Sequence, residues 1–279
     1  MRTSEAIQQF IAARMSAGAA GNTIAAYRYD LDLLARATGD RSVAEITPGD
    51  ISAFLTAASA PATRKRRLTS IRALFRWSLA EGHVQTDPSA AFTQVRFEQP
   101  PLVHLSEDEE IALVFASAND AAWSELAIHL MLHYGLTRND LLLLRPGDIR
   151  ETAEGTAIQI VDDARPLSPV NRTLSVSPYL LDLYSAYRER VPASERIFTI
   201  GPPAINGMVD RVRRRAGIPH KISPRTLRDT CTINLAINGL GATEILAYLG
   251  MVDESRNRQT MQRLIDRYVL FQESPSRAN

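Results

Sequence analysis

A pair of arginines at the start of one predicted helix is the clearest chemical signal in the chain. Ser223 is a good helix cap and Pro224 suits the first helical position, so a helix should begin there. Arg225 and Arg228 follow three residues apart, on one face of its first turns. Helix N-termini favour anions, and guanidinium groups hold oxyanions through paired hydrogen bonds. The segment therefore predicts an anion-binding site.

Positive charge is concentrated in two parts of a chain whose net charge is only +1. All but two of the 32 basic residues are arginines, the exceptions being Lys65 and Lys221. Two acid-free clusters of this kind favour a polyanion partner contacted at two places, although two solvated helix faces would give the same pattern. The clusters are Arg64, Lys65, Arg66, Arg67, Arg72 and Arg76, and then Arg211, Arg213, Arg214, Arg215, Lys221, Arg225 and Arg228.

Several other kinds of site are not supported by the sequence. The single cysteine, Cys231, rules out an intramolecular disulfide and lies in an apolar helical stretch, where it is expected to pack in the core. The five histidines show no convincing zinc spacing, so neither a metal nor a small-molecule cofactor is predicted. No apolar run reaches the length of a membrane span, and we expect a cytoplasmic, nucleoid-associated protein.

The elements that must hold these residues begin with a helical domain. Helical spacing and caps predict helices over 4–18, 22–39, 47–58 and 62–82. In the last of these, Leu68, Ile71, Phe75 and Leu79 form an apolar stripe, with Lys65, Arg72 and Arg76 along one flank. These segments predict a compact helical domain over residues 1–93.

A second, longer domain follows an extended linker. Two prolines and mixed polarity predict a linker over 94–105, and Ser106 with Glu109 forms a capping box that opens a new helix. The domain over 106–279 should be mostly helical. A β-rich run, a proline-broken turn and a second strand from Arg172 predict a small antiparallel sheet within it. The predicted fold class is therefore mainly α with a small antiparallel sheet.

Several local sequences, in this order, resemble the tyrosine recombinases of the phage-integrase type. The segments "GNTIAAYRYDLDLLARATG" and "RKRRLTSIRALFRWSLAEGHVQTDPSAAF" are similar to the family's N-terminal core-binding (SAM-like) domain. "YGLTRNDLLLLRPGDI" and "SPRTLRDTCTINLAINGLGATEILAYLGM" are similar to parts of its catalytic domain. The resemblance extends from about Ser4 to Phe271. It implies that the two domains clamp duplex DNA between them. It also implies that the protein assembles on DNA as a homo-oligomer and that it needs no metal.

Much of the family's catalytic set does not match this sequence. The family's first arginine directly follows Gly-Leu, but Thr137 stands there and Arg138 comes one residue late, about 100° further round a helix. The family's hairpin lysine has no counterpart between Lys65 and Lys221; Arg165 lies near the hairpin tip, and arginine is a poor proton donor at neutral pH.

The family's second motif, His-x-x-Arg, is only half retained. Its arginine is Arg228, whereas its histidine is replaced by Arg225 and the histidine after the arginine by Asp229. The histidine or tryptophan after Leu-Gly is Met251. An arginine in place of histidine can hold a phosphate but makes a poor acid or base near pH 7.

The nucleophile position has two candidates. Tyr268 is the only tyrosine after Tyr248, but it lies further beyond Leu-Gly than the family's tyrosine. Matching the family's Thr-x-x-x-Tyr to Thr260 instead puts Leu264 at the nucleophile position. Either Tyr268 or Leu264 therefore occupies it.

These observations lead to a duplex-DNA-binding member of the family that acts in recombination or integration with an impaired or lost strand-transfer site. The alternatives are an active recombinase that forms a 3′-phosphotyrosyl intermediate through Tyr268, or a helical interaction module without a nucleic-acid role. Whether the chain is an enzyme stays open, with a non-enzyme favoured. The candidate catalytic residues are Arg138, Arg225, Arg228 and Tyr268. The candidate DNA contacts are Arg64, Lys65, Arg66, Arg72, Arg76, Arg211, Arg213, Arg214, Arg215, Arg225 and Arg228.

Overall fold

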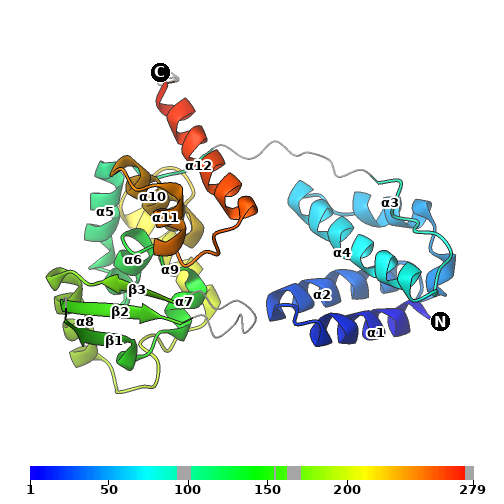
Figure 1. The fold of residues 1–279 in the computed structure, drawn as a ribbon, viewed down its shortest axis with the longest axis horizontal. Coiled ribbons are helices and arrows are strands. Elements are labelled where there is room, and N and C mark those ends of the chain that lie inside the picture. Colours follow the sequence, from blue (N-terminus) through cyan, green and yellow to red (C-terminus); the bar gives the residue numbers. More distant parts are fainter. Residues whose placement is uncertain (93–101, 154, 162–170, 274–279) are drawn as a thin grey trace. The chain divides into compact units, whose positions relative to one another are not determined.

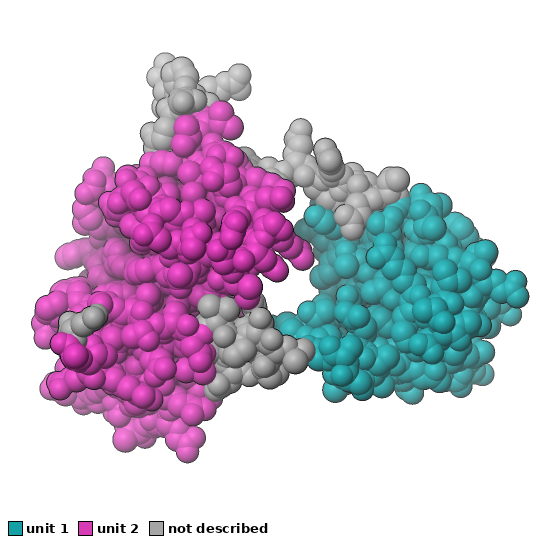
Figure 2. All heavy atoms as spheres, in the orientation of Figure 1, with its two compact units in different colours: residues 1–100 teal, residues 101–279 magenta. Residues whose placement is uncertain are grey.

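The computed structural model describes residues 1–92, 102–153, 155–161 and 171–273. For residues 271–273 it describes the backbone alone. The chain forms two compact units, Met1–Pro100 and Pro101–Asn279 (Figure 2). Residues 94–101 of the predicted linker lie outside the described part, so the predicted linker bounds stay a prediction.

Unit 1 is helical, with the four predicted helices and one added turn (Figure 1). Its core contains Phe10, Leu31, Ile51 and Phe75, all nearly or fully inaccessible to solvent. The predicted apolar stripe is wrong only at its last member. Leu79 is 44% exposed, because the buried face of the last turn passes through Ser78, which is fully buried, and not through Leu79. The elements are α1 Thr3–Ser16, α2 Gly21–Ala37, η1 Val43–Glu45, α3 Pro48–Thr56 and α4 Pro61–Ala80.

Unit 2 is mainly helical with one small sheet, which confirms the predicted fold class. The capping box predicted at Ser106 is present, because the Ser106 hydroxyl accepts a hydrogen bond from the Glu109 amide at the start of the first helix. The elements are α5 Glu107–Ser117, α6 Ser124–Leu132, α7 Arg138–Leu143, η2 Pro146–Asp148, β1 Ile149–Thr152, β2 Gly155–Ile160, β3 Arg172–Ser175, α8 Pro178–Arg190, α9 Pro202–Arg215, α10 Pro224–Ile237, α11 Ala242–Tyr248 and α12 Ser255–Glu273.

The sheet is antiparallel in the order β1-β2-β3. Ile158 in the middle strand pairs with Ile149 on one side and Leu174 on the other, and Ile160 pairs with Arg172. Ile158 and Leu174 are buried, so one face of the sheet packs on the unit's core. Arg165 and the predicted hairpin tip lie outside the described residues.

Helix α10 is central in unit 2 and contacts α6, α9, α11 and α12. Cys231 lies in its buried face, and burial raises the pKa of that thiol to about 12, in agreement with the predicted packing role. In the part of the chain that is described, no helix combines the length and apolarity needed to cross a membrane. The same residues contain no group of three or more histidine, cysteine or acidic side chains arranged to hold a metal ion.

Candidate functional site

The first turn of α10 carries the two arginines singled out in the sequence, and its predicted cap is present. The Ser223 hydroxyl accepts a hydrogen bond from the Thr226 amide, and Pro224 occupies the first helical position. The arginine side chains have different surroundings. Arg225 is 82% exposed and its Nε donates to Asp229 Oδ2 at 3.4 Å, whereas only 17% of the Arg228 side chain is exposed.

Arg228 reaches inward and binds main-chain oxygens. Its Nη2 donates to the Leu249 carbonyl at 2.7 Å and its Nη1 donates to the Gly135 carbonyl. The same Nη1 lies 3.9 Å from Asp140 Oδ2. Burial, with a contribution from a neighbouring arginine, lowers the pKa of Arg228 to about 10, so the group remains a cation at neutral pH.

The neighbouring cation is Arg172 of β3, which the sequence analysis did not select. Its side chain is 7% exposed; Nη2 donates to Asp140 Oδ2 at 3.2 Å and Nη1 donates to the Leu249 carbonyl. Burial lowers the pKa of Arg172, and its buried Nε has no hydrogen-bond partner in the described structure. We call Arg172 and Arg228 the arginine pair, and Asp140 is the carboxylate that both approach.

A sequence signal for Arg172 exists, although it is short. In β3, Arg172 and Leu174 point inward while Thr173 and Ser175 are exposed. An arginine that takes an apolar position in an alternating strand should be buried against a carboxylate or main-chain carbonyls. The partner residues are far away in sequence, so the alternation alone would not have identified them.

Asp140 is fixed by the start of α7. The Thr137 amide donates to Asp140 Oδ2 at 2.8 Å, and the Asp140 amide donates to the Thr137 hydroxyl at 3.1 Å, which makes a capping box. Thr137, which stands where the family has its first arginine, is therefore the cap of α7. Arg138 is the first residue of the helix and is half-buried; its side chain has no hydrogen bond or ion pair to a described residue.

The turn after α11 brings a main-chain carbonyl to both arginines. Gly250 has φ +64°, and a Cβ at this residue would overlap the Arg172 guanidinium. The next residue, Met251, packs with a small apolar cluster that includes Leu246 and Met261. The position where the family has histidine or tryptophan is therefore part of a hydrophobic contact between α11 and α12.

Asp229 adds a second carboxyl group to this region. Its burial raises the pKa, and Arg225, Arg228 and Arg267 oppose that rise. Asp229 forms an ion pair with Arg225.

Both nucleophile candidates lie on α12, one turn apart, and both are half-buried. The ring of Tyr268 meets that of His104 edge to face, with 4.8 Å between centroids. His104 belongs to the segment that precedes α5, so this contact holds that segment against α12. The choice between Tyr268 and Leu264 stays a prediction.

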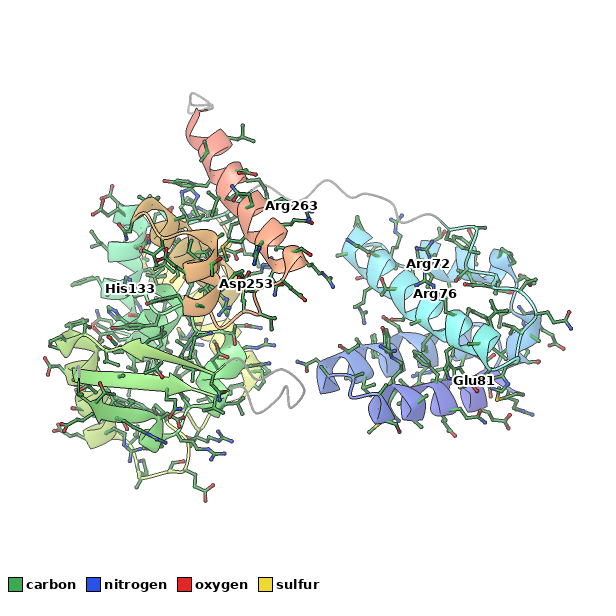
Figure 3. All side chains as sticks on the ribbon, viewed as in Figure 1. Arg72, Arg76, Glu81, His133, Asp253 and Arg263 are labelled. Carbon is green, nitrogen blue, oxygen red and sulfur yellow. The ribbon has the colours of Figure 1, made fainter. Side chains whose placement is uncertain are left out.

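The basic cluster of α4 divides into exposed and engaged side chains. Lys65 and Arg76 are exposed and have no hydrogen bond or ion pair from their side chains to described residues. Arg72, labelled with Arg76 in Figure 3, donates to the Phe92 carbonyl. Arg64 donates to the Ala58 carbonyl at 2.9 Å.

The two arginines between Lys65 and Arg72 are also engaged within unit 1. Arg66 pairs with the buried Asp30 at 3.0 Å and lies over the Tyr29 ring. Arg67 donates to the Phe54 carbonyl at 3.0 Å and lies over the Phe54 ring.

The arginines of α9 all form ion pairs within unit 2. Arg211 contacts Asp120 at 2.8 Å and Arg215 contacts it at 3.4 Å. Burial would raise the pKa of Asp120, but hydrogen bonds from Arg211, the Ala121 amide and Ser124 outweigh it and lower the pKa to about 2. Arg213 and Arg214 both pair with Asp210. Their proposed contacts with DNA stay predictions.

Comparison with solved structures identifies the architecture as that of the integrases. A lambda integrase dimer bound to a COC′ core site matches 96% of this chain and 96% of its own with a TM-score of 0.77 at 17% identity. A lambda integrase tetramer bound to a Holliday junction matches 93% of this chain and 77% of its own, with a TM-score of 0.74 at 18% identity. At these identities the likeness establishes the fold alone.

Sequence comparison finds relatives in one family. Residues 7–82 match the phage integrase N-terminal SAM-like domain. Tyrosine recombinase XerC of Erythrobacter litoralis is 26% identical over 275 residues, covering 91% of this chain and 86% of its own length. Tyrosine recombinase XerD of Ralstonia nicotianae is 29% identical over 273 residues, covering 91% and 88%. These matches support membership of the tyrosine recombinase family, which the sequence motifs predicted.

Proposed function

We propose that this protein binds duplex DNA and acts in DNA recombination or integration. The family supports this function, because the relatives are named tyrosine recombinases and two of the similar structures are of a lambda integrase on a core site and on a Holliday junction. The exposed Lys65 and Arg76 on α4, whose side chains have no partner among the described residues, offer cations to the phosphate backbone. The structures of integrase dimers and tetramers support assembly as a homo-oligomer on DNA.

We further propose that strand transfer is impaired or lost. The observation that carries this proposal is that two positions of the family's catalytic arginines have structural roles in this chain. Thr137 stands at the first arginine position and caps α7, while the Arg228 guanidinium donates to the Gly135 and Leu249 carbonyls. In phosphoryl transfer, such cations must stabilise the charge that develops on phosphate, and losing one donor typically reduces the rate by about 10²–10³.

The proton-transfer groups are also replaced. Arg225 stands at a histidine position and remains charged near pH 7, and the thioether of Met251 carries no transferable proton. Of the candidate catalytic residues, we assign the exposed Arg225 to holding phosphate, with Arg228 beneath it adding positive charge to the site. A DNA-binding role in the cytoplasm, on the nucleoid, agrees with this assignment.

The deciding experiment is a test for covalent attachment to DNA. The full chain and a Tyr268→Phe variant are incubated with sheared DNA from the source organism, and bound DNA is recovered before and after SDS. We expect both proteins to bind DNA equally and to release all of it in SDS. DNA that survives SDS only with the wild-type chain would be a phosphotyrosyl adduct and would overturn the loss of strand transfer. Absence of binding before SDS would overturn the DNA-binding proposal.

A further inference from the structure

A groove of about 500 Å³ lies between α5, α6 and the start of α8, on unit 2. On one side, Ile111 and Phe115 stand one helical turn apart on α5 and are 63% and 76% exposed. Two large apolar side chains exposed together beside a hollow are uncommon on a protein that has no partner.

The other side of the groove is aromatic and incompletely hydrogen-bonded. The ring of His129 on α6 lies 5.0 Å from that of His133, which directly follows the helix, and 5.1 Å from that of Tyr179 (His133 is labelled in Figure 3). His129 is 8% exposed, and its buried Nε2 has no hydrogen-bond partner in the described structure. The groove thus has an apolar contact surface and an unused polar atom in its wall.

The charge of the groove is opposite to that of the basic clusters. Glu107 and Glu110 from α5 and Glu125 from α6 line it, and its lining contains no lysine or arginine from the described residues. The first turn of α5 is acidic at four successive residues, 107–110. Carboxylates at this density repel a phosphate backbone, so the groove is unsuited to DNA.

We propose that this groove binds a basic amphipathic helix of a partner protein. A helix laid between α5 and α6 would place apolar side chains at i and i+4 against Ile111 and Phe115. Lysines or arginines beside those positions would pair with Glu107, Glu110 and Glu125. The inference is independent of the proposed function, because none of these residues takes part in the arginine pair or the α4 cluster.

The test uses two labelled peptides of about 18 residues with the same leucine face, one with lysine and one with glutamate at all other positions. Binding to the full chain is measured by fluorescence anisotropy. We expect the basic peptide to bind and the acidic peptide to bind at least about tenfold more weakly. The double variant Ile111→Ser/Phe115→Ser should weaken the basic peptide by about tenfold or more, because truncated anchors dominate such interfaces.

Matched variants distinguish peptide binding in the groove from nonspecific binding elsewhere on the surface. Ile237→Ser removes an apolar side chain that is 59% exposed on α10, outside the groove, and should leave peptide binding unchanged. Glu107→Gln/Glu125→Gln should weaken the basic peptide and reduce its salt dependence, while Glu244→Gln on α11 should not. Circular dichroism checks that each variant is folded.

Three results would overturn the proposal. These are no binding of the basic peptide, equal binding of both peptides, or equal losses in the groove variants and their controls. Sedimentation of the chain alone gives a fourth criterion. A wild-type dimer that Ile111→Ser/Phe115→Ser dissociates would mean that a second copy of this chain covers the groove, which also contradicts the proposal.

Discussion

At the scale of single residues, the arginine pair is held by more main-chain than side-chain oxygens. Arg172 and Arg228 share the Leu249 carbonyl and approach one oxygen of Asp140, and Arg228 also binds the Gly135 carbonyl. Two buried cations beside one carboxylate leave a local excess of positive charge. Main-chain carbonyls offset part of that excess through their dipoles, and an incoming anion would offset more.

Removing one arginine of the pair should destabilise unit 2. Arg172→Met leaves the Leu249 carbonyl and Asp140 with one partner fewer each. We expect the free energy of unfolding to fall by about 2–4 kcal/mol, as for other broken buried pairs. Urea unfolding is followed by Trp123 fluorescence in a Trp77→Phe background, so that the signal comes from unit 2 alone. Arg190→Met, at an exposed position on α8, should change stability by less than about 0.5 kcal/mol; an equal loss there would contradict the buried role of Arg172.

The exposed cations of α4 should contribute to DNA affinity through phosphate contacts. In Lys65→Gln/Arg76→Gln, the slope of log K against log salt should become less steep by about 1.8, because each lost phosphate contact removes about 0.9. Duplex binding measured from 50 to 300 mM salt tests this. Arg14→Gln/Arg36→Gln, two exposed cations on α1 and α2, is the matched control; a similar change in the control would show that α4 has no special role.

At the scale of elements, the connection between α5 and α6 is tied to α9 through one carboxylate. The pKa of Asp120 is lowered to about 2, so its ion pairs contribute stability above the unfolded pKa near 4 that is lost as the pH falls through 2. Asp120→Asn should therefore cost about 2 kcal/mol at pH 7. The stability difference from wild type should shrink steadily between pH 4 and pH 2 in urea titrations. A difference that is independent of pH would contradict the ionic origin.

The turn between α11 and α12 depends on Gly250 for two separate reasons. Gly250→Ala must adopt a positive φ and also displace the Arg172 guanidinium, whereas Gly239→Ala, at φ +88° with nothing near its Cβ, faces only the first cost. We expect a loss of about 1 kcal/mol for Gly239→Ala and clearly more for Gly250→Ala, measured by thermal unfolding. In an Arg172→Met background the two glycine variants should become similar. Equal losses in the wild-type background would contradict the steric contact.

Much of this architecture could be predicted from the sequence because the signals are local. Ser106, Thr47 and Ser223 cap helices where their neighbours indicate, and the apolar spacing of α4 marks its buried face. The arginine pair could not be predicted in the same way. Arg172 meets Asp140, 32 residues away, and the carbonyl of Leu249, 77 residues away; that acceptor is main chain and leaves no mark in the sequence. The ion pairs of Arg211 and Arg215 with Asp120 also join residues that are far apart in the sequence, so local patterns do not indicate them.

At the scale of the whole molecule, each unit has a core of its own. Phe10, Leu34 and Phe75 belong to the core of unit 1, while Met131 and Leu227 belong to that of unit 2. We expect residues 1–93 and 102–279, produced separately, each to unfold cooperatively. Each fragment should bind duplex DNA more weakly than the full chain, because covalent joining raises the effective concentration of the second contact. Circular dichroism and anisotropy measure these properties; a fragment that binds as tightly as the full chain would contradict two-part binding.

The sign of the surface charge also differs between regions of the molecule. The net charge of +1 sums over the whole chain and does not reveal the basic α4 surface or the acidic groove on unit 2. Net charge therefore describes this protein poorly. Salt should affect binding to DNA and binding to a basic peptide through different sets of residues, and the variants described above separate the two.

Helix α6 links the acidic groove to the arginine pair, both within unit 2. It carries Glu125 and His129 into the groove, and three residues beyond its last turn the Gly135 carbonyl meets Arg228. A ligand in the groove that shifts this helix would change the hold on Arg228, and with it the affinity for an anion there. Thermodynamic linkage makes such an effect mutual: the factor by which the peptide alters DNA affinity is the factor by which DNA alters peptide affinity. The protein would then report occupancy of one ligand as a change in its response to the other.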